Sequence, residues 1–225
     1  MLPKFNDSSL LTTALTHRSA LNENASAATE SNERLEFLGD AVLELATTEF
    51  LFAQYPAEPE GVLTAYRSAL VKTETLAEVA SELNLGEKLY LSHGEEATGG
   101  RTNPGLLADT TEAIIGALYQ DQGYEAVKKF LAQNLFPKFK EIKAKKLYKD
   151  AKSLLQEVVQ AQGQTAPTYH VLKAEGPDHD KKFTVEVKVA QETVATGNGS
   201  SKQAAQQQAA RKALKQFEAQ NQTQD

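Results

Sequence analysis

The chain has 225 residues, 40% of them hydrophobic and 24% charged, and it contains no cysteine. This length accommodates two modest domains, the composition is that of a soluble globular protein, and the lack of cysteine excludes disulfides and thiolate metal sites. The first eleven residues have no sustained apolar run. We therefore expect neither a signal peptide nor a membrane anchor there, and a reducing, cytoplasmic location.

The net charge of −6 is unevenly distributed. Residues 1–148 carry 14 Lys and Arg against 21 Asp and Glu, whereas residues 149–225 carry 10 against 9. A lysine-rich run lies around the border and consists of Lys138, Lys140, Lys143, Lys145, Lys146, Lys149 and Lys152. This asymmetry suggests two domains with different partners, although a solvated helix end explains the run equally well on its own.

The first part of the chain has a helical pattern. Apolar residues at helical period predict a helix over residues 32–54, with Asn32 as its N-cap and Pro56 beyond its end. Further helices are predicted over residues 62–70, 73–83, 104–120 and 124–140. The glycine-containing stretch 92–103 predicts an irregular loop.

After Asp150 the period changes. A helix is predicted over residues 151–162, then strands over 168–174, 181–189 and 192–196, and then a helix to about Phe217. A Gly- and Ser-rich segment, residues 197–201, connects the last strand to that helix. The predicted fold class is α+β: an all-helical domain at 1–147, an α-β-β-β-α domain at 148–219, and a disordered tail at 220–225.

An acidic stripe marks the first predicted helix. Its members share one helical face at i, i+3, i+7 and i+11, and they are Glu33, Glu36, Asp40 and Glu44. A second pair, Asp109 and Glu112, lies at i, i+3 between apolar residues. Stacked carboxylates repel, and a half-buried stripe raises its own pKa values unless a cation neutralises it. Oxygen-only ligands favour Mg²⁺ or Mn²⁺.

If the two helices pack face to face, Glu36, Asp40, Asp109 and Glu112 converge on one site. A cation bound there could activate water against a phosphodiester. The spacing of the acids alone favours solvated surface residues. The apolar residues that flank both sets of acids favour a metal site instead. The physical argument by itself goes no further than a divalent-metal site.

The stretch Asn-Glu-Arg-Leu-Glu-Phe-Leu-Gly-Asp, residues 32–40, resembles the signature of bacterial ribonuclease III. Residues 14–20 and 107–116 resemble two further motifs of that family, and the likeness covers essentially the whole chain. The resemblance implies an endoribonuclease that cleaves double-stranded RNA. It also implies a homodimer with one Mg²⁺-dependent site per subunit, where Mn²⁺ can substitute.

Carried over by motif position, Glu36, Asp109 and Glu112 are metal ligands, while Asp40 and Glu112 are catalytic. The implied reaction is phosphodiester hydrolysis that leaves 5′-phosphates and short 3′ overhangs. Ribosomal RNA precursors and structured messenger RNAs are the implied substrates. Glu33 is a supporting acid for substrate contact or local structure.

Several residues near the motifs have two interpretations. Phe37 resembles the aromatic residue that docks into the other subunit, and the alternative is a core phenylalanine. We assign His17 and Arg18 to packing and hydrogen bonding rather than chemistry. Glu44 is more consistent with a surface glutamate, and Arg67, with its neighbour Ser68, belongs either to RNA phosphate contact or to a plain helix surface.

The C-terminal module resembles a double-stranded-RNA-binding domain, which reads 2′-hydroxyls and phosphates rather than bases. The predicted RNA contacts come from its first helix, a loop and the start of its second helix: Gln156, Glu157, His179, Ser201 and Lys202. The family usually places two or three basic residues at the second helix start, and here Lys202 stands alone. We therefore expect modest affinity and a shallow salt dependence from the isolated module, with more of the grip left to the dimer and the lysine-rich run.

Two other classes compete with this interpretation. The first is a catalytically silent double-stranded-RNA-binding protein on the same fold, which the presence of all four acids disfavours. The second is a different helical metalloenzyme, which would need histidine ligands, but no Glu-x-x-His or His-Glu-x-x-His motif occurs. A P-loop is also absent, so no nucleotide cofactor is expected. The lack of an apolar run near the N-terminus predicts no membrane partner.

Overall fold

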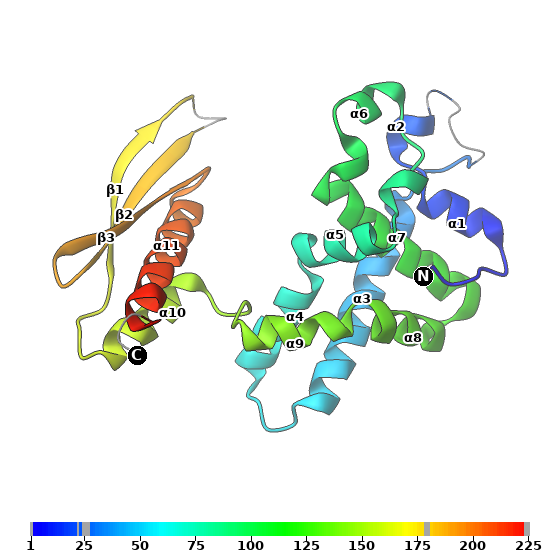
Figure 1. Ribbon diagram of the computed structural model, residues 1–225. Coiled ribbons are helices and arrows are strands. Elements are labelled where there is room, and N and C mark those ends of the chain that lie inside the picture. Colours follow the sequence, from blue (N-terminus) through cyan, green and yellow to red (C-terminus); the bar gives the residue numbers. More distant parts are fainter. Residues whose placement is uncertain (1, 22, 24–27, 178–180, 223–225) are drawn as a thin grey trace. The chain divides into compact units, whose positions relative to one another are not determined.

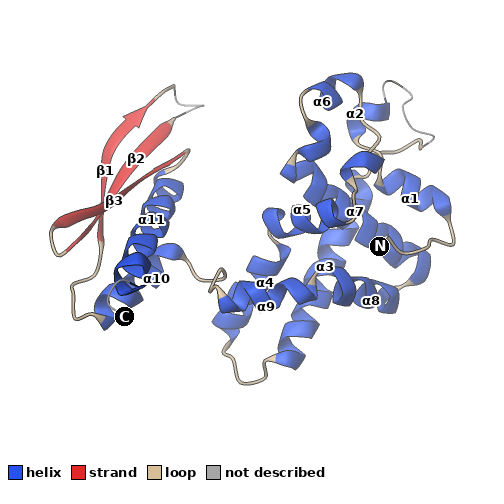
Figure 2. Ribbon diagram, in the orientation of Figure 1, coloured by secondary structure: helices blue, strands red, loops and turns tan. Residues whose placement is uncertain are grey.

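The computed structural model describes residues 2–21, 23, 28–177 and 181–222. The chain divides into two compact units, Met1–Tyr148 and Lys149–Asp225 (Figure 1). The first unit is helical, and the second combines helices with antiparallel strands (Figure 2). The predicted α+β class is therefore confirmed. Within the described residues, no helix has the length and apolarity needed to span a membrane.

The helical unit is built around α3 (Glu33–Gln54) and α7 (Pro104–Gln122), which pack against each other. Leu43, Ile114 and Ile115 are fully buried at this centre. The surrounding elements, in chain order, are α1 (Ser8–Ala14), α2 (Arg18–Leu21), α4 (Glu60–Val71), α5 (Thr73–Glu82), η1 (Gly86–Lys88), α6 (His93–Ala97), η2 (Gly100–Thr102), α8 (Tyr124–Asn134), η3 (Phe136–Lys138) and α9 (Phe139–Ala144).

Two glycines allow α3 and α7 to approach unusually closely. A Cβ atom on Gly39 would lie 1.8 Å from the carbonyl oxygen of Glu112, and one on Gly116 would lie 2.1 Å from that of Leu35. Any side chain at either position would push the helices apart. The glycine contact therefore sets the distance between the acidic faces of the two helices.

Two predictions for this unit were wrong in detail. The stretch 92–103 contains α6 and η2, because Ser92 caps the first of them by accepting the backbone N–H of Glu95 at 3.2 Å. The helix predicted over 124–140 is divided into α8, η3 and α9. Pro137 lies at the division, and proline cannot donate the backbone hydrogen bond that a continuous helix requires.

The second unit contains α10 (Ala151–Ala161), β1 (Thr168–Glu175), β2 (Lys182–Val189), β3 (Glu192–Gly199) and α11 (Lys202–Gln222). Among the described residues the strands form one antiparallel sheet in the order β1-β2-β3. The predicted alternation along β2 is confirmed, since Val185, Val187 and Val189 are buried. Val187 and Val189 belong to a core that includes residues of α10 and α11.

Strand β3 extends past its predicted end at residue 196, to Gly199. The two glycines in this extension lie against the backbone of α11. A Cβ atom on Gly197 would be 2.3 Å from the carbonyl oxygen of Ala205, and one on Gly199 would be 2.5 Å from the backbone nitrogen of the same residue. Glycine here serves close packing rather than a loop. Helix α11 continues to Gln222, and residues 223–225 of the predicted tail lie outside the described residues.

Candidate active site and RNA-binding surface

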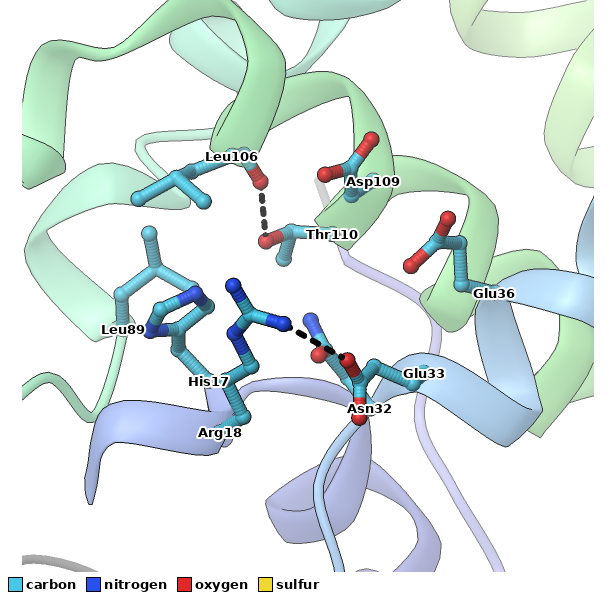
Figure 3. Close-up of a pocket in the computed structure, with 9 residues that line it drawn as sticks. All are labelled: His17, Arg18, Asn32, Glu33, Glu36, Leu89, Leu106, Asp109 and Thr110. Carbon is cyan, nitrogen blue, oxygen red and sulfur yellow. Dashed lines mark hydrogen bonds and ion pairs between the residues drawn. The ribbon is translucent and has the colours of Figure 1, made fainter.

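The acids of the two motifs lie on either side of the glycine contact. Glu36 and Asp40 are on α3, and Asp109 and Glu112 are on α7. Glu36 and Asp109 line the same pocket, and their carboxylates lie close to each other in Figure 3. The structure thus brings together, across two helices, residues that are about seventy positions apart in the sequence.

The electrostatics of these acids show that the four are coupled. Burial, followed by the charges of Asp40, Glu36 and Asp109, raises the pKa of Glu112 to about 8. Burial is also the main cause of the raised pKa values of Glu36 and Asp109, and at Asp109 the nearby His17 acts in the opposite direction. None of these four acids forms an ion pair with another described residue. The negative charge at this point is therefore uncompensated by the protein.

The donor set fits a divalent cation. It offers carboxylate oxygens only, which are the ligands of hard cations such as Mg²⁺ and Mn²⁺. In the described part of the chain, no three acids, histidines or cysteines are grouped closely enough to hold an ion as they stand. The four acids therefore fit a divalent cation because their charge is uncompensated and Glu112 is half-buried. Their side chains do not already form a coordination shell.

The outer two acids of the α3 stripe each form an ion pair with an arginine. Glu33 lies 3.6 Å from Arg18 and also accepts the hydroxyl hydrogen of Ser31 at 2.9 Å. Glu44 lies 2.8 Å from Arg67. The stripe therefore separates into two paired acids and two unpaired ones, and Arg67 is engaged on α3.

An apolar face of α3 lies beside the acids. Phe37 is 82% exposed, so the interpretation as a core phenylalanine is wrong. Leu45 and Phe52 on the same helix are also largely exposed. A hollow next to Phe37 is lined in part by Leu10 and Leu38.

In the second unit the predicted contacts are exposed. Gln156 and Glu157 lie on the surface of α10, with Glu157 2.5 Å from Lys149. Ser201 caps α11 by accepting the backbone N–H of Ala204 at 3.1 Å, and Lys202 is the exposed first residue of that helix. His179 lies outside the described residues.

The lysine-rich run, described throughout, is largely engaged with the protein itself. Lys138 pairs with Glu82 at 2.7 Å, and Lys143 lies 4.1 Å from the centre of the Tyr55 ring. Lys145 and Lys149 form ion pairs, and Lys152 donates to Gln206 at 2.8 Å. Less of this run is available to RNA than its charge alone suggests.

Known proteins resemble the chain along most of its length. Residues 7–139 match the family described as Ribonuclease-III-like, and residues 151–217 match the double-stranded RNA binding motif. Ribonuclease 3 of Roseiflexus sp. (strain RS-1) is 47% identical over 212 residues, which are 93% of this chain and 90% of that protein. Ribonuclease 3 of Bacillus licheniformis is 48% identical over 211 residues, 94% of this chain and 84% of that protein.

The chain belongs to the ribonuclease III family. Among solved structures it is similar to the nuclease domain of ribonuclease III from Campylobacter jejuni, with 42% identity and a TM-score of 0.55 over 60% of this chain and 92% of that one. It is a ribonuclease III-type endoribonuclease, and its second unit is a double-stranded-RNA-binding domain. The silent RNA-binding alternative is thereby disfavoured further.

The structure also places three polar residues beside the acids that the sequence did not assign to the site. His17, Arg18 and Asn32 line the same pocket as Glu36 and Asp109 (Figure 3). Asn32 occupies the N-cap position of α3, but the predicted cap is absent, because its side chain accepts no hydrogen bond from the helix. Its backbone is helical, with φ −72° and ψ −10°, which turns the side chain away from a capping geometry. No local pattern reveals this.

Proposed function

We propose that this ribonuclease III hydrolyses double-stranded RNA at the α3–α7 crossing with Mg²⁺, for which Mn²⁺ substitutes. Glu36, Asp109 and Glu112 hold the cation, and Asp40 is the carboxylate beside the reacting phosphate. One observation carries the proposal. The half-buried Glu112 shares α7 with Asp109 and lies across the glycine contact from Glu36 and Asp40 on α3, and burial together with these neighbours raises its pKa to about 8.

A divalent cation at this position would supply positive charge for the phosphate and acidify an attacking water. The protein contributes the arrangement. Glu36 on α3 and Asp109 on α7 would hold the cation from two different helices. The carboxylate of Asp40 orients the water for in-line attack on the phosphate. Burial and the neighbouring acids favour the protonated form of Glu112 at neutral pH, and a bound cation would favour its ionised form.

The proposed assembly is a homodimer with an isologous interface that includes Phe37. The 82% exposure of Phe37 and the hollow beside it support this, because a symmetric pair can place each ring in the other subunit's hollow. The Campylobacter structure is described as containing a region involved in dimer formation. Two sites acting on opposite strands would leave 5′-phosphates and short 3′ overhangs.

The second unit would hold the duplex through Gln156, Glu157, His179, Ser201 and Lys202. The exposed positions of the described members of this set, together with the helix N-terminus at Ser201 and Lys202, support phosphate and 2′-hydroxyl contact. We place the domain limits at residues 1–147 and 148–219. Ribosomal RNA precursors and structured messenger RNAs are the proposed substrates.

The direct test is incubation of the full chain with a long perfect RNA duplex. We expect cleavage with Mg²⁺, none with EDTA, and recovery when Mg²⁺ is restored in excess. A single-stranded RNA of the same sequence serves as control and should stay intact. Cleavage that persists in EDTA, or equal cleavage of both RNAs, would refute the proposal. End-labelled products separate 5′-phosphates from 5′-hydroxyls.

A further inference from the structure

A cavity of about 280 Å³ opens beside the proposed metal site, between α2, the start of α3 and α7 (Figure 3). Glu36 and Asp109 form one side of it, and His17, Arg18 and Asn32 provide polar groups on the other. The proposed reaction does not use these three residues. Each of them has a feature that points to a bound partner.

The amide of Asn32 is the first such feature. The residue is only 4% exposed, and its side chain lines the cavity. Its backbone is fully used: the N–H donates to Thr16 at 2.8 Å, and the carbonyl accepts the N–H of Glu36 at 2.8 Å. Across the described residues, the side-chain amide has no hydrogen-bond partner. An amide that lines a cavity and has no partner in the protein is free to bond a polar group that enters the cavity.

The imidazole of His17 is the second feature. Its Nδ1 accepts the backbone N–H of Ser19 at 3.3 Å and lies 2.8 Å from the Ser19 hydroxyl oxygen. That oxygen also accepts the backbone N–H of Ser92 at 3.0 Å. Because Nδ1 acts as an acceptor, the ring hydrogen is on Nε2. The ring therefore offers its Nε2–H as a donor to the cavity that it lines.

The guanidinium of Arg18 is the third feature. It is 73% exposed at the rim and lies 3.6 Å from the Glu33 carboxylate. Glu33 is held in turn by the Ser31 hydroxyl at 2.9 Å. Glu33 therefore positions an arginine whose remaining N–H groups are open to solvent, and a guanidinium is well suited to phosphate oxygens.

We infer that this cavity is a subsite for the sugar–phosphate backbone of the strand being cut. The amide of Asn32, the Nε2–H of His17 and the guanidinium of Arg18 donate to acceptor oxygens of a nucleotide next to the scissile phosphate. All three groups are hydrogen-bond donors, and the backbone is the part of an A-form duplex that presents acceptors at the surface. The ligand oxygen belongs either to a phosphate or to a ribose 2′-hydroxyl. The inference rests on the proposed cleavage at the adjacent acids.

The test combines enzyme variants with modified substrates. A short duplex with one cleavage site carries a single methylphosphonate, or a single 2′-deoxynucleotide, at each position around the cut. The full-length wild type and Asn32→Ala are compared by kcat/KM. Asn6→Ala is the matched control, because Asn6 is exposed and uses its backbone N–H to contact Asp121. Cleavage of the unmodified duplex by the wild type tests the proposed function separately.

We expect one position at which modification lowers the wild-type kcat/KM by roughly tenfold. On the unmodified duplex, the kcat/KM of Asn32→Ala should be lower than that of the wild type by a similar factor. Modifying the duplex at the sensitive position should not lower the kcat/KM of Asn32→Ala any further. Asn6→Ala should behave as wild type on both duplexes. If the methylphosphonate penalty disappears in Asn32→Ala, the ligand of Asn32 is a phosphate oxygen. If the 2′-deoxynucleotide penalty disappears instead, the ligand is the 2′-hydroxyl. Penalties that are equal in wild type and Asn32→Ala at every position would overturn the inference. If Asn32→Ala does not fold, the same scan with the exposed Arg18→Ala decides.

Discussion

The two units place their functional groups in opposite environments. At the α3–α7 crossing the acids are partly buried and uncompensated, and a glycine contact lets the helices that carry them approach closely. On α10 and α11 the proposed RNA contacts are exposed, and Glu157 is already paired with Lys149. Unpaired, partly buried acids at the α3–α7 crossing therefore cost stability, whereas the exposed groups on α10 and α11 cost little. Four predictions test this contrast.

The largest effect is expected from Glu112→Gln. The amide keeps the shape of the side chain and removes the negative charge that the cation requires, so cleavage should fall on the order of a thousandfold. Single-turnover cleavage at saturating enzyme with Mg²⁺ measures this. Glu125→Gln, on the surface of α8 and paired with Lys128, is the matched control and should retain activity. A loss of less than tenfold in Glu112→Gln would contradict the assignment.

The next effect concerns the glycine contact. Gly39→Ala would place a Cβ atom 1.8 Å from the Glu112 carbonyl oxygen, so α3 and α7 must separate. We expect a destabilisation of about 3 kcal/mol in urea unfolding, together with reduced cleavage. Gly61→Ala on α4, where a Cβ atom meets nothing within 4 Å, should be neutral or stabilising by about 0.5–1 kcal/mol. Similar stabilities for both variants would show that the close approach is unimportant.

A smaller effect appears in the pH dependence of stability without metal. The pKa of Glu112 is about 4.5 in the unfolded chain and is raised to about 8 in the fold. The folded state therefore holds the extra proton between these values, and stability is lost as pH rises through that window.

Glu112→Gln should remove this dependence and be more stable than the wild type at pH 8 in EDTA. After allowance for solvent screening at the partly exposed carboxyl, the gain should be on the order of 1–2 kcal/mol. Thermal unfolding between pH 5 and pH 8 measures it. A wild type whose stability rises across this range would refute the sign.

The smallest effect is expected at the RNA-binding surface. Lys202→Ala removes one proposed phosphate contact at an exposed position, so RNA affinity should drop several-fold and the salt slope should fall by about 1. Stability should change by less than about 0.5 kcal/mol. Binding to a duplex across a salt series, in a Glu112→Gln background that does not cut, measures this. Lys212→Ala, also exposed on α11, is the control, and an equal loss there would remove the special role of the helix start.

Local patterns were enough to predict the main elements. Helix α3 begins at Glu33 and ends at Gln54 as its apolar period indicates, and β2 alternates as expected. The patterns gave wrong element limits where packing between distant segments determines the backbone conformation. Gly197 and Gly199 look like loop residues, but they extend β3 because only glycine fits beneath α11. The serine cap that begins α6 was similarly hidden in a glycine-containing stretch.

The amino-acid order was enough to predict the α+β class and the family, both of which are confirmed, and it singled out the acids proposed for the site, because helical spacing and motif matches depend on neighbours along the chain. The tertiary structure decided which acids face one another and which are paired with arginine, since Glu33 and Glu36 share a stripe but meet different partners. It also decided that Phe37 is exposed and that Asn32 lines the cavity beside Glu36 and Asp109. Helical phase assigns a residue to a face, and only the packing of distant segments determines what that face meets.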